Sequence, residues 1–328
     1  MMFKSAIKAT LLRVAFFLCS GLILSGCAHA TKEYALITNQ LSNNVSVIDT
    51  HTQQIIKTIP VGKSPAGITV SPKHDLAFVT NPDGQDISVI DLKSLTETRR
   101  IKTGPGPVGI VATQDGNHVY VADWYKDNIR DINPITGDVL DIFDVGQSPA
   151  GMVLDESKHR LYVANRDDNT VAVIDLASHK ILKTIMVGTA PFGLAITPDG
   201  SKVYSVNVQS SDVTVIDTDK LTVQTTIAVG PWPYCAVVSN AGDKLYVVNQ
   251  DDATISVVDT ASNKITNTIQ IEDTPEGIDI SADGKLIYAV NWGDNTVSVI
   301  DSKTEKVINS ITVNKGPRSF GQFITEVK

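Results

Sequence analysis

The sequence predicts an all-β fold, a seven-bladed β-propeller made of four-stranded blades of 42 residues each. Three observations lead to this prediction: a repeat of constant period, four short strand patterns in every copy, and two chain ends that complement each other. The repeat is clearest in an asparagine that closes phrases such as "YVAN" and returns every 42 residues, replaced once by aspartate. It occupies Asn39, Asn81, Asp123, Asn165, Asn207, Asn249 and Asn291.

Two other residue types keep the same spacing. A turn proline recurs every 42 residues from Pro65 to Pro317, and a position that closes "VID" recurs from Asp49 to Asp301. Seven copies therefore run from Tyr34 to about Glu326 without an insertion or a deletion. This continuity predicts one array and not two separate domains.

Each copy contains four short apolar runs. In the copy around residue 170, "KILKTIMVG" follows "HRLYVAN" and "NTVAVID", and "FGLAITP" opens the next copy. These runs are rich in β-branched residues, alternate with period two and are bounded by Asn, Asp and Gly turns, which is typical of strands. Four short strands per copy indicate a propeller blade. A helical solenoid would need apolar residues at i, i+3 and i+4 over ten or more residues, a pattern that the repeats lack.

The two ends of the array predict how the ring closes. The array begins at "EYALITN", which corresponds to the second strand of a blade, and ends at "RSFGQFITEV", where a first strand belongs. We expect the C-terminal strand to complete the first blade. Pairing the two ends would remove an open sheet edge that could otherwise recruit another chain.

The repeat also resembles the YVTN-repeat β-propeller family. The residues that carry the resemblance are "FVTN" at 78–81, "YVVN" at 246–249 and "YAVN" at 288–291, followed by "VSVID" and "VGxxPxG" elements. It extends over nearly all of residues 34–326 and implies the propeller fold. The motif residues build blades, so the resemblance alone implies no particular activity.

The N-terminus resembles a bacterial lipoprotein signal. A positively charged start is followed by "VAFFLCSGLIL", which is too short to span a bilayer, and by "LSGC" ending at Cys27. We expect a signal peptide at 1–26, a lipidated Cys27 with a short tether at 27–33, and the propeller at 34–328. Ala28 follows the cysteine where an inner-membrane retention signal would place Asp, which favours the outer membrane, facing either the periplasm or the surface. The alternative is an ordinary secretory signal cut after "AHA".

Cysteine usage and charge restrict the chemistry. With Cys19 removed and Cys27 acylated, Cys235 is the remaining thiol, so no intramolecular disulfide is expected. Its surroundings, "GPWPYCAV", contain no cation, which favours a small buried side chain over a reactive thiolate. Loss of Lys4, Lys8 and Arg13 takes the formal net charge of −8 to about −11. Such an acidic protein is poorly suited to nucleic acid.

Acidic residues gather on one face of the predicted ring, the face that holds the turns between second and third strands and the connections between blades. The aromatic and charged departures from the repeat also fall there, around the predicted mouth of the central channel. Trp, Tyr and Arg are enriched in binding hot spots, although aromatic residues could instead pack between blades. The candidate binding residues are Trp124, Tyr125, Arg166, Phe192, Trp232, Tyr234, Gln250, Glu276, Trp292 and Arg318.

Blade three departs from the repeat in its third strand, "NIRDINP". Asp131 stands where the other six copies have Val, and a carboxylate in such an inter-blade position is costly unless it is paired or protonated. Arg130 should point to the opposite face of the strand. Asp131 is therefore a candidate buried acid with a partner elsewhere, either a local specialisation or drifted packing.

Known catalytic motifs are missing from the sequence, including CxxCH, GxSxG, HExxH and a Walker loop. No cofactor is expected, and the weak candidates for a divalent cation are Asp167, Asp168, Asp251 and Asp252. We expect a monomeric, non-catalytic, lipid-anchored platform that docks an envelope protein or extended ligand at its acidic, aromatic mouth. The alternative is an enzyme or redox accessory subunit, similar to the propellers of lactonases or quinone dehydrogenases, acting at the same mouth.

Overall fold

The structure is a computed structural model that describes residues 32–327. The predicted lipidation residue, Cys27, and the predicted signal peptide lie outside this range, so their assignment remains a prediction. Within the described part of the chain, no helix has the length and hydropathy needed to cross a membrane.

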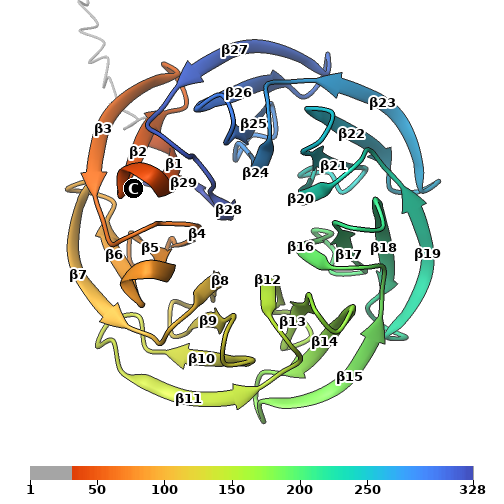
Figure 1. Cartoon of the computed structure of the whole chain (residues 1–328), viewed down its shortest axis with the longest axis horizontal. Helices are drawn as coiled ribbons and strands as arrows, with labels where there is room; N and C mark the ends of the chain where they lie inside the picture. Colours follow the sequence, from red (N-terminus) through yellow and green to blue (C-terminus); the bar gives the residue numbers. More distant parts are fainter. Residues whose placement is uncertain (1–31, 328) are drawn as a thin grey trace, which may run out of the picture. The chain divides into compact units, whose positions relative to one another are not determined.

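Seven sheets surround a central axis (Figure 1), each with four antiparallel strands in radial order, as the sequence predicts; one sheet has an additional short parallel strand. Blade 1 consists of β29 (Ile324–Val327), β1 (Lys32–Asn39), β2 (Asn44–Asp49) and β3 (Gln54–Pro60). Blade 2 consists of β4 (Gly67–Ser71), β5 (Leu76–Asn81), β6 (Asp86–Asp91) and β7 (Thr96–Lys102). Blade 3 consists of β8 (Pro107–Ala112), β9 (Val119–Asp123), β10 (Asn128–Ile132) and β11 (Val139–Asp144).

The other four blades repeat this order. Blade 4 consists of β12 (Pro149–Asp155), β13 (Arg160–Asn165), β14 (Thr170–Asp175) and β15 (Lys180–Met186). Blade 5 consists of β16 (Pro191–Ile196), β17 (Lys202–Asn207), β18 (Asp212–Asp217) and β19 (Thr222–Ala228). Blade 6 consists of β20 (Pro233–Val238), β21 (Lys244–Asn249), β22 (Thr254–Asp259) and β23 (Lys264–Gln270). Blade 7 consists of β24 (Pro275–Ile280), β25 (Leu286–Asn291), β26 (Thr296–Asp301) and β27 (Lys306–Thr312).

The C-terminal segment closes the ring. Strand β29 pairs antiparallel with β1, with Ala35 opposite Ile324 and Lys32 opposite Val327. A short preceding strand, β28 (Phe320–Gly321), pairs in parallel with β4 of blade 2. Strand β1 begins at Lys32, within the range expected for the tether, and the buried Glu33 accepts hydrogen bonds from Thr50 Oγ1 and the Ala282 amide, both at 2.6 Å.

The recurring asparagine and aspartate hold turns, which explains their fixed positions. Asn249 Nδ2, for example, donates to Thr254 Oγ1 at 2.9 Å and to Ser256 Oγ at 3.0 Å across the hairpin. Asp259 Oδ1 accepts the Ser262 amide at 2.7 Å and thereby closes the turn to the outer strand. The Asp259 bond, from a backbone amide to a side chain, is of the kind that stabilises tight turns. These residues are therefore architectural.

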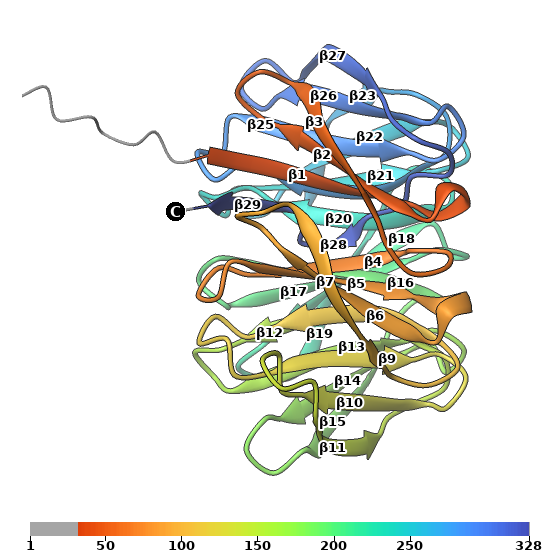
Figure 2. The same cartoon turned by 90° about the vertical axis from the view of Figure 1, so that its left-hand side faces the viewer.

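Two faces of the ring must be distinguished (Figure 2). The mouth face carries the turns between second and third strands, including the 3-10 turns η1 (Gln40–Ser42) and η2 (Pro82–Gly84), together with the connections between blades. The tether face carries the turns between first and second and between third and fourth strands, and β1 starts there. The core lies between neighbouring blades, where one fully buried tyrosine per blade packs in blades 3 to 7 at Tyr120, Tyr162, Tyr204, Tyr246 and Tyr288.

Candidate functional site

Several sequence-predicted candidates meet across the channel axis at the mouth face, because the inner strands of all blades begin there. The ring of Phe192, in β16, stacks on Tyr234 of β20 with a centroid separation of 4.2 Å and meets Phe320 of β28 edge-on at 5.4 Å. The half-buried Trp124, just after β9, lies 6.4 Å from Phe192. Small residues of the inner strands, such as Ala150, belong to the same apolar cluster. We call Trp124, Phe192, Tyr234 and Phe320 the mouth cluster.

An ion pair is embedded in the mouth cluster. Arg318 Nε donates to Glu276 Oε2 at 2.5 Å, and Arg318 Nη2 donates to the Tyr234 hydroxyl at 2.9 Å. The guanidinium also lies 5.5 Å from the centroid of the Phe320 ring. Burial raises the pKa of Glu276, whereas Arg318 and a hydrogen bond from Gln250 act in the opposite direction. The pair therefore compensates two charges that the apolar surroundings would otherwise penalise.

Arg166 extends the arrangement toward solvent. Its guanidinium lies 5.9 Å from the centroid of the Trp124 ring, within the range of a cation–π contact, and donates to Asp167 Oδ1 at 2.7 Å. Seven of the ten candidates are therefore connected: Trp124, Arg166, Phe192, Tyr234, Gln250, Glu276 and Arg318.

The other three candidates lie on the same face but remain exposed. Tyr125 is 71% exposed, and its ring lies along Gly106, where a Cβ atom would come within 2.6 Å of the ring. Trp232 is 41% exposed and Trp292 36% exposed, and Trp292 flanks Gly316 together with the exposed Leu41. The mouth face thus combines a packed aromatic centre with exposed aromatic side chains around it.

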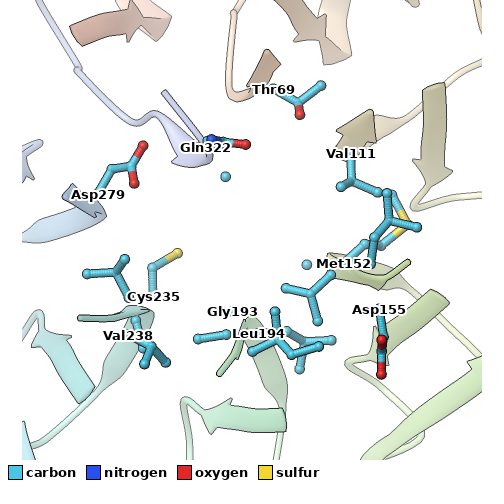
Figure 3. Close-up of a pocket in the computed structure, with 18 of the residues that line it drawn as sticks. Thr69, Val111, Met152, Asp155, Gly193, Leu194, Cys235, Val238, Asp279 and Gln322 are labelled. Carbon is cyan, nitrogen blue, oxygen red and sulfur yellow. The ribbon is translucent and has the colours of Figure 1, made fainter. Parts of the chain in front are cut away.

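The open part of the channel lies behind the mouth cluster. A cavity of about 640 Å³ is lined by the inner strands of the blades, and Phe192, Cys235 and Phe320 form its inner end. Figure 3 shows side chains from these strands around the central space. The cavity reaches the turns of the tether face at Gln114 and Asp199. The sequence-based candidate set did not include this cavity, although Phe192 contributes to it.

One carboxylate stands in the cavity wall. Asp279, in β24, is 8% exposed, and its Oδ2 accepts the Phe323 and Ile324 amides, each at 2.8 Å. Burial raises its pKa to about 7, although these backbone hydrogen bonds lower it. The like charge of Glu33 adds to the increase. Equivalent positions of the other copies hold Thr, Val, Ala or Gly. That departure from the repeat is the sequence signal that would have identified Asp279.

Cys235 lines the same cavity as a buried free thiol. Burial raises the pKa of the thiol well above its usual range, and the neighbouring Glu276 acts in the same direction. The uncharged thiol is therefore the favoured form, which is unsuitable for a nucleophile. The structure agrees with the expectation of a small buried side chain.

The buried acid of blade three has two histidine partners. Asp131 is 1% exposed; His118 Nδ1 lies 2.9 Å from its Oδ1, and His179 Nε2 lies 3.6 Å from its Oδ2. The other ring nitrogen of His179 lies 2.6 Å from Asp141 Oδ2. Arg130 lies instead 3.9 Å from Asp123, on the opposite side of the strand, as predicted. Asp131 therefore belongs to a hydrogen-bonded cluster between blades 3 and 4.

Three of the four weak cation candidates accept hydrogen bonds from residues on the mouth face. Asp167 accepts from Ser148 Oγ at 2.6 Å, Asp168 from the Gln147 amide at 2.8 Å, and Asp252 from Thr254 Oγ1 at 2.7 Å. Over residues 32–327, no group of three or more His, Cys, Asp or Glu side chains is arranged to hold a metal ion. Asp167, Asp168, Asp251 and Asp252 thus form no ligand set in the described structure.

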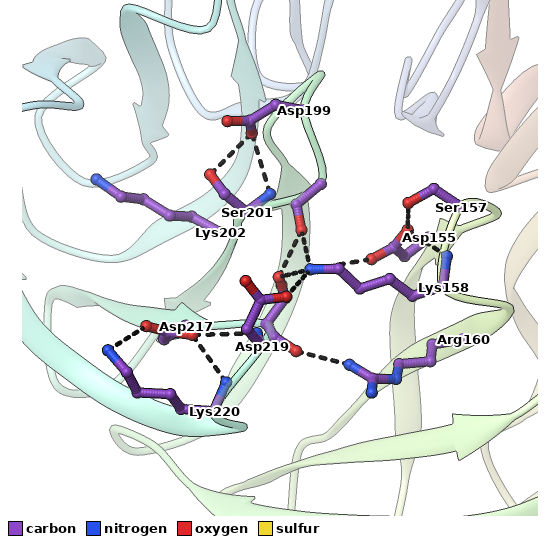
Figure 4. A network of polar contacts seen from close by, with 12 residues as sticks. Asp155, Ser157, Lys158, Arg160, Asp199, Ser201, Lys202, Asp217, Asp219 and Lys220 are labelled. Atoms are coloured by element: carbon purple, nitrogen blue, oxygen red, sulfur yellow. Dashed lines mark hydrogen bonds and ion pairs between the residues drawn. The ribbon is translucent and has the colours of Figure 1, made fainter.

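Figure 4 shows polar contacts between blades 4 and 5; three of the residues drawn, Asp155, Ser157 and Asp199, also line the cavity. Asp155 accepts from Ser157 Oγ at 2.6 Å and lies 4.0 Å from Lys158 Nζ. Lys158 Nζ also contacts Asp219 at 2.6 Å and donates to the Gly200 carbonyl at 3.1 Å. The nearest cation to Asp155 is therefore Lys158, in the turn that follows β12.

Comparison with known proteins supports the fold. The family model described as YNCE-like β-propeller matches residues 93–202. No curated protein matches the chain in sequence. Together with the seven sheets, the partial family match identifies the chain as a β-propeller.

Three solved structures illustrate the likeness. Hydrazine synthase of Kuenenia stuttgartiensis aligns with a TM-score of 0.72 at 19% identity, covering 78% of this chain and 88% of that one. A functionally unknown protein from Desulfotomaculum acetoxidans aligns with a TM-score of 0.76 at 15% identity, covering 90% and 98%. Dihydro-heme d1 dehydrogenase NirN, in complex with DHE, aligns with a TM-score of 0.66 at 16% identity, covering 85% and 63%. At these identities the likeness concerns the fold alone.

Proposed function

We propose that this protein is a non-catalytic binding platform of the bacterial cell envelope, anchored by lipid on Cys27, which docks a basic segment of a partner protein on its mouth face. The observation that carries the proposal is the set of exposed aromatic side chains, Tyr125, Trp232 and Trp292, around the packed mouth cluster. Aromatic residues of this kind dominate binding hot spots.

Charge complementarity favours a basic partner. Acidic side chains lie on the turns of the same face, and several of them, such as Asp83 and Asp168, use their oxygens to hold loops while keeping the negative charge at the surface. A positively charged segment would be steered to this face, and the attraction would weaken with salt. Rigidity also supports the proposal. The closed ring of seven blades already holds the aromatic groups in place, so binding a partner would not require the blades to become ordered.

Site-specific photo-crosslinking tests the docking surface. A photoreactive phenylalanine derivative at position 125 reports on the mouth face, and the same residue at position 142, where Ile142 of β11 is 47% exposed, is the matched control on the outer wall of the same blade. We expect a crosslinked protein in native envelopes from position 125 and not from position 142, with a yield that falls as salt increases. Equal yields at the two positions, or a crosslinked partner of acidic character, would overturn the proposal.

The anchor is tested separately. Cys27→Ser should move the protein from the membrane fraction to the soluble fraction and abolish incorporation of an alkyne-labelled fatty acid, since stable attachment needs more than one acyl chain. Fractionation by density then distinguishes the outer from the inner membrane. Retention of the label in the Cys27→Ser variant would exclude acylation at this residue.

The alternative, an enzyme or redox accessory subunit acting at the same mouth, rests on the general likeness to propeller enzymes. It would be favoured over docking if purified protein with an intact mouth bound a small redox cofactor that a Trp124→Ala variant failed to bind.

A further inference from the structure

The walls of the central cavity combine aliphatic side chains with polar and acidic ones. Aliphatic side chains that remain partly exposed line it, among them Val111, Val153, Leu154, Ile196 and Val237. Water against these aliphatic side chains finds few hydrogen-bonding partners, whereas an apolar group placed there would release that water and bury its own surface. The volume of about 640 Å³ lies within the range of small-molecule sites.

The charges at the cavity have one sign. No Lys, Arg or His side chain lines it within residues 32–327, whereas Asp155, Glu156, Asp199 and Asp279 do. Asp155 lies 4.0 Å from Lys158 Nζ, which places a compensating cation outside the cavity. Asp199 accepts from Ser201 in its own turn at 2.8 Å. An anionic ligand would therefore meet repulsion and no counter-charge.

Asp155 and Asp279 are the buried carboxylates of this lining, and backbone amides satisfy Asp279 without the nearby lysine that Asp155 has. Its Oδ2 holds the two amides of the closing segment, while its Oδ1 accepts the Ile280 amide at 2.9 Å. A carboxylate offers about four acceptor positions, so Oδ1 retains capacity for another donor. The charged group that acts on it is Glu33 of β1, which has the same sign. A cation placed in the cavity would relieve both the burial and the repulsion of this carboxylate.

We propose that the central cavity binds a small molecule with an apolar body and one ammonium or similar cationic group, which pairs with Asp279. The apolar body contacts the aliphatic walls, and the mouth cluster closes the inner end of the site. Entry is from the tether face, so this site is separate from the docking surface on the mouth face and does not depend on it.

Isothermal titration calorimetry with three eight-carbon probes tests the proposal: n-octylammonium, n-octanol and n-octanoate. The titrations are made at pH 8, above the pKa of about 7 that burial gives Asp279, so that its carboxylate is ionised. Octylammonium should bind at least tenfold more tightly than octanol, and octanoate should bind most weakly. Equal affinities for the three probes, or no binding of octylammonium, would overturn the proposal.

Two substitutions separate the cavity from non-specific binding to exposed apolar strands. Asp279→Asn should bring octylammonium to within about threefold of octanol, because the counter-charge is lost while the walls remain. Val111→Trp, which fills the cavity without touching Asp279, should abolish binding of all three probes. Tyr125→Ala on the mouth face is the matched control and should bind like the wild type.

Circular dichroism and thermal unfolding first establish that each variant is folded. If Asp279→Asn proves unstable because it holds the closing segment, Val111→Trp decides by itself: unchanged octylammonium binding in that variant would place the ligand elsewhere and refute the site. Loss of binding in Tyr125→Ala would refute the separation of this site from the docking surface.

Discussion

The ion pair in the mouth cluster gives the sharpest stability prediction. Replacing Arg318 with Met removes the cation that Glu276 faces and the donor to the Tyr234 hydroxyl, while retaining an apolar side chain of comparable length. The Glu276 side chain is 9% exposed and that of Arg318 is 20% exposed, so water cannot fully replace the lost partner. The substitution should therefore leave a carboxylate buried and unpaired.

The magnitude follows from burial and distance. Two unit charges about 4 Å apart attract by about 4 kcal/mol at an effective dielectric constant of about 20. Removing one partner of a buried ion pair typically lowers the free energy of unfolding by about 3–5 kcal/mol. Because Arg318 is partly exposed, we expect the lower end, a decrease of about 3 kcal/mol in the free energy of unfolding. Part of this loss should disappear at low pH, where Glu276 takes up a proton.

Equilibrium unfolding in urea at pH 7 measures the effect, with the wild type, Arg318→Met, Glu276→Met and the double variant compared at one protein concentration. Replacing both partners by apolar groups should restore most of the stability, to within about 1–2 kcal/mol of the wild type, since no unpaired charge remains. The coupling energy from this cycle isolates the pair. A loss of less than about 1 kcal/mol in Arg318→Met, or an additive double variant, would refute the interpretation.

Three other predictions concern positions outside the mouth. Asp131→Val should lower the free energy of unfolding by about 1–2 kcal/mol in urea titrations, because His118 loses its hydrogen-bond partner and His179 loses a nearby carboxylate; a gain, as expected for a return to the repeat residue, would contradict this. Asp279 has its pKa raised to about 7, so its stabilising contribution is complete below about pH 4 and lost as the pH rises to 7. The free energy of unfolding of Asp279→Asn should therefore rise relative to that of the wild type across that range, by a few kcal/mol at most since one pKa unit is about 1.4 kcal/mol. Parallel stability–pH curves for the two proteins would refute this prediction. Deleting residues 322–328, which include β29, should lower the thermal midpoint and promote association seen by size-exclusion chromatography, because β1 becomes an open edge; an unchanged monomer with an unchanged midpoint would show that closure depends on other contacts.

The fold was predictable because its information is local and repeated. Each blade of this chain contains the same turn residues at the same offsets, and the hydrogen bonds of Asn249 and Asp259 show why those positions tolerate few substitutes. The chain ends predict the closure of the ring. Blade 1 lacks its first strand and the C-terminus carries an extra one, so pairing the two is the arrangement that leaves no open edge. The parallel pairing of β28 with β4 has no counterpart in the repeat and was not predicted.

The candidate site was predictable only in part. Departures from the repeat located the aromatic and charged residues of the mouth face, and Phe192, Tyr234 and Arg318 do meet there. Which of them would pack and which would stay exposed depends on side-chain direction and on the diameter of the ring, so Tyr125 and Phe192 could not be separated in sequence. Whether these residues bind a partner remains a prediction for the crosslinking experiment.

The sequence by itself determined the number of blades, their strand order and the faces on which the loops lie. Each copy of 42 residues forms its strands and turns through contacts between residues that are close in the chain. Only the tertiary structure decided which residues share a site when they come from different blades. The histidine partners of Asp131 lie on other turns, and Glu33, the like charge near Asp279, lies at the opposite end of the chain. The channel is filled at one end and open at the other because single side chains from seven copies meet on the axis, and their combined volume is a property of the closed ring.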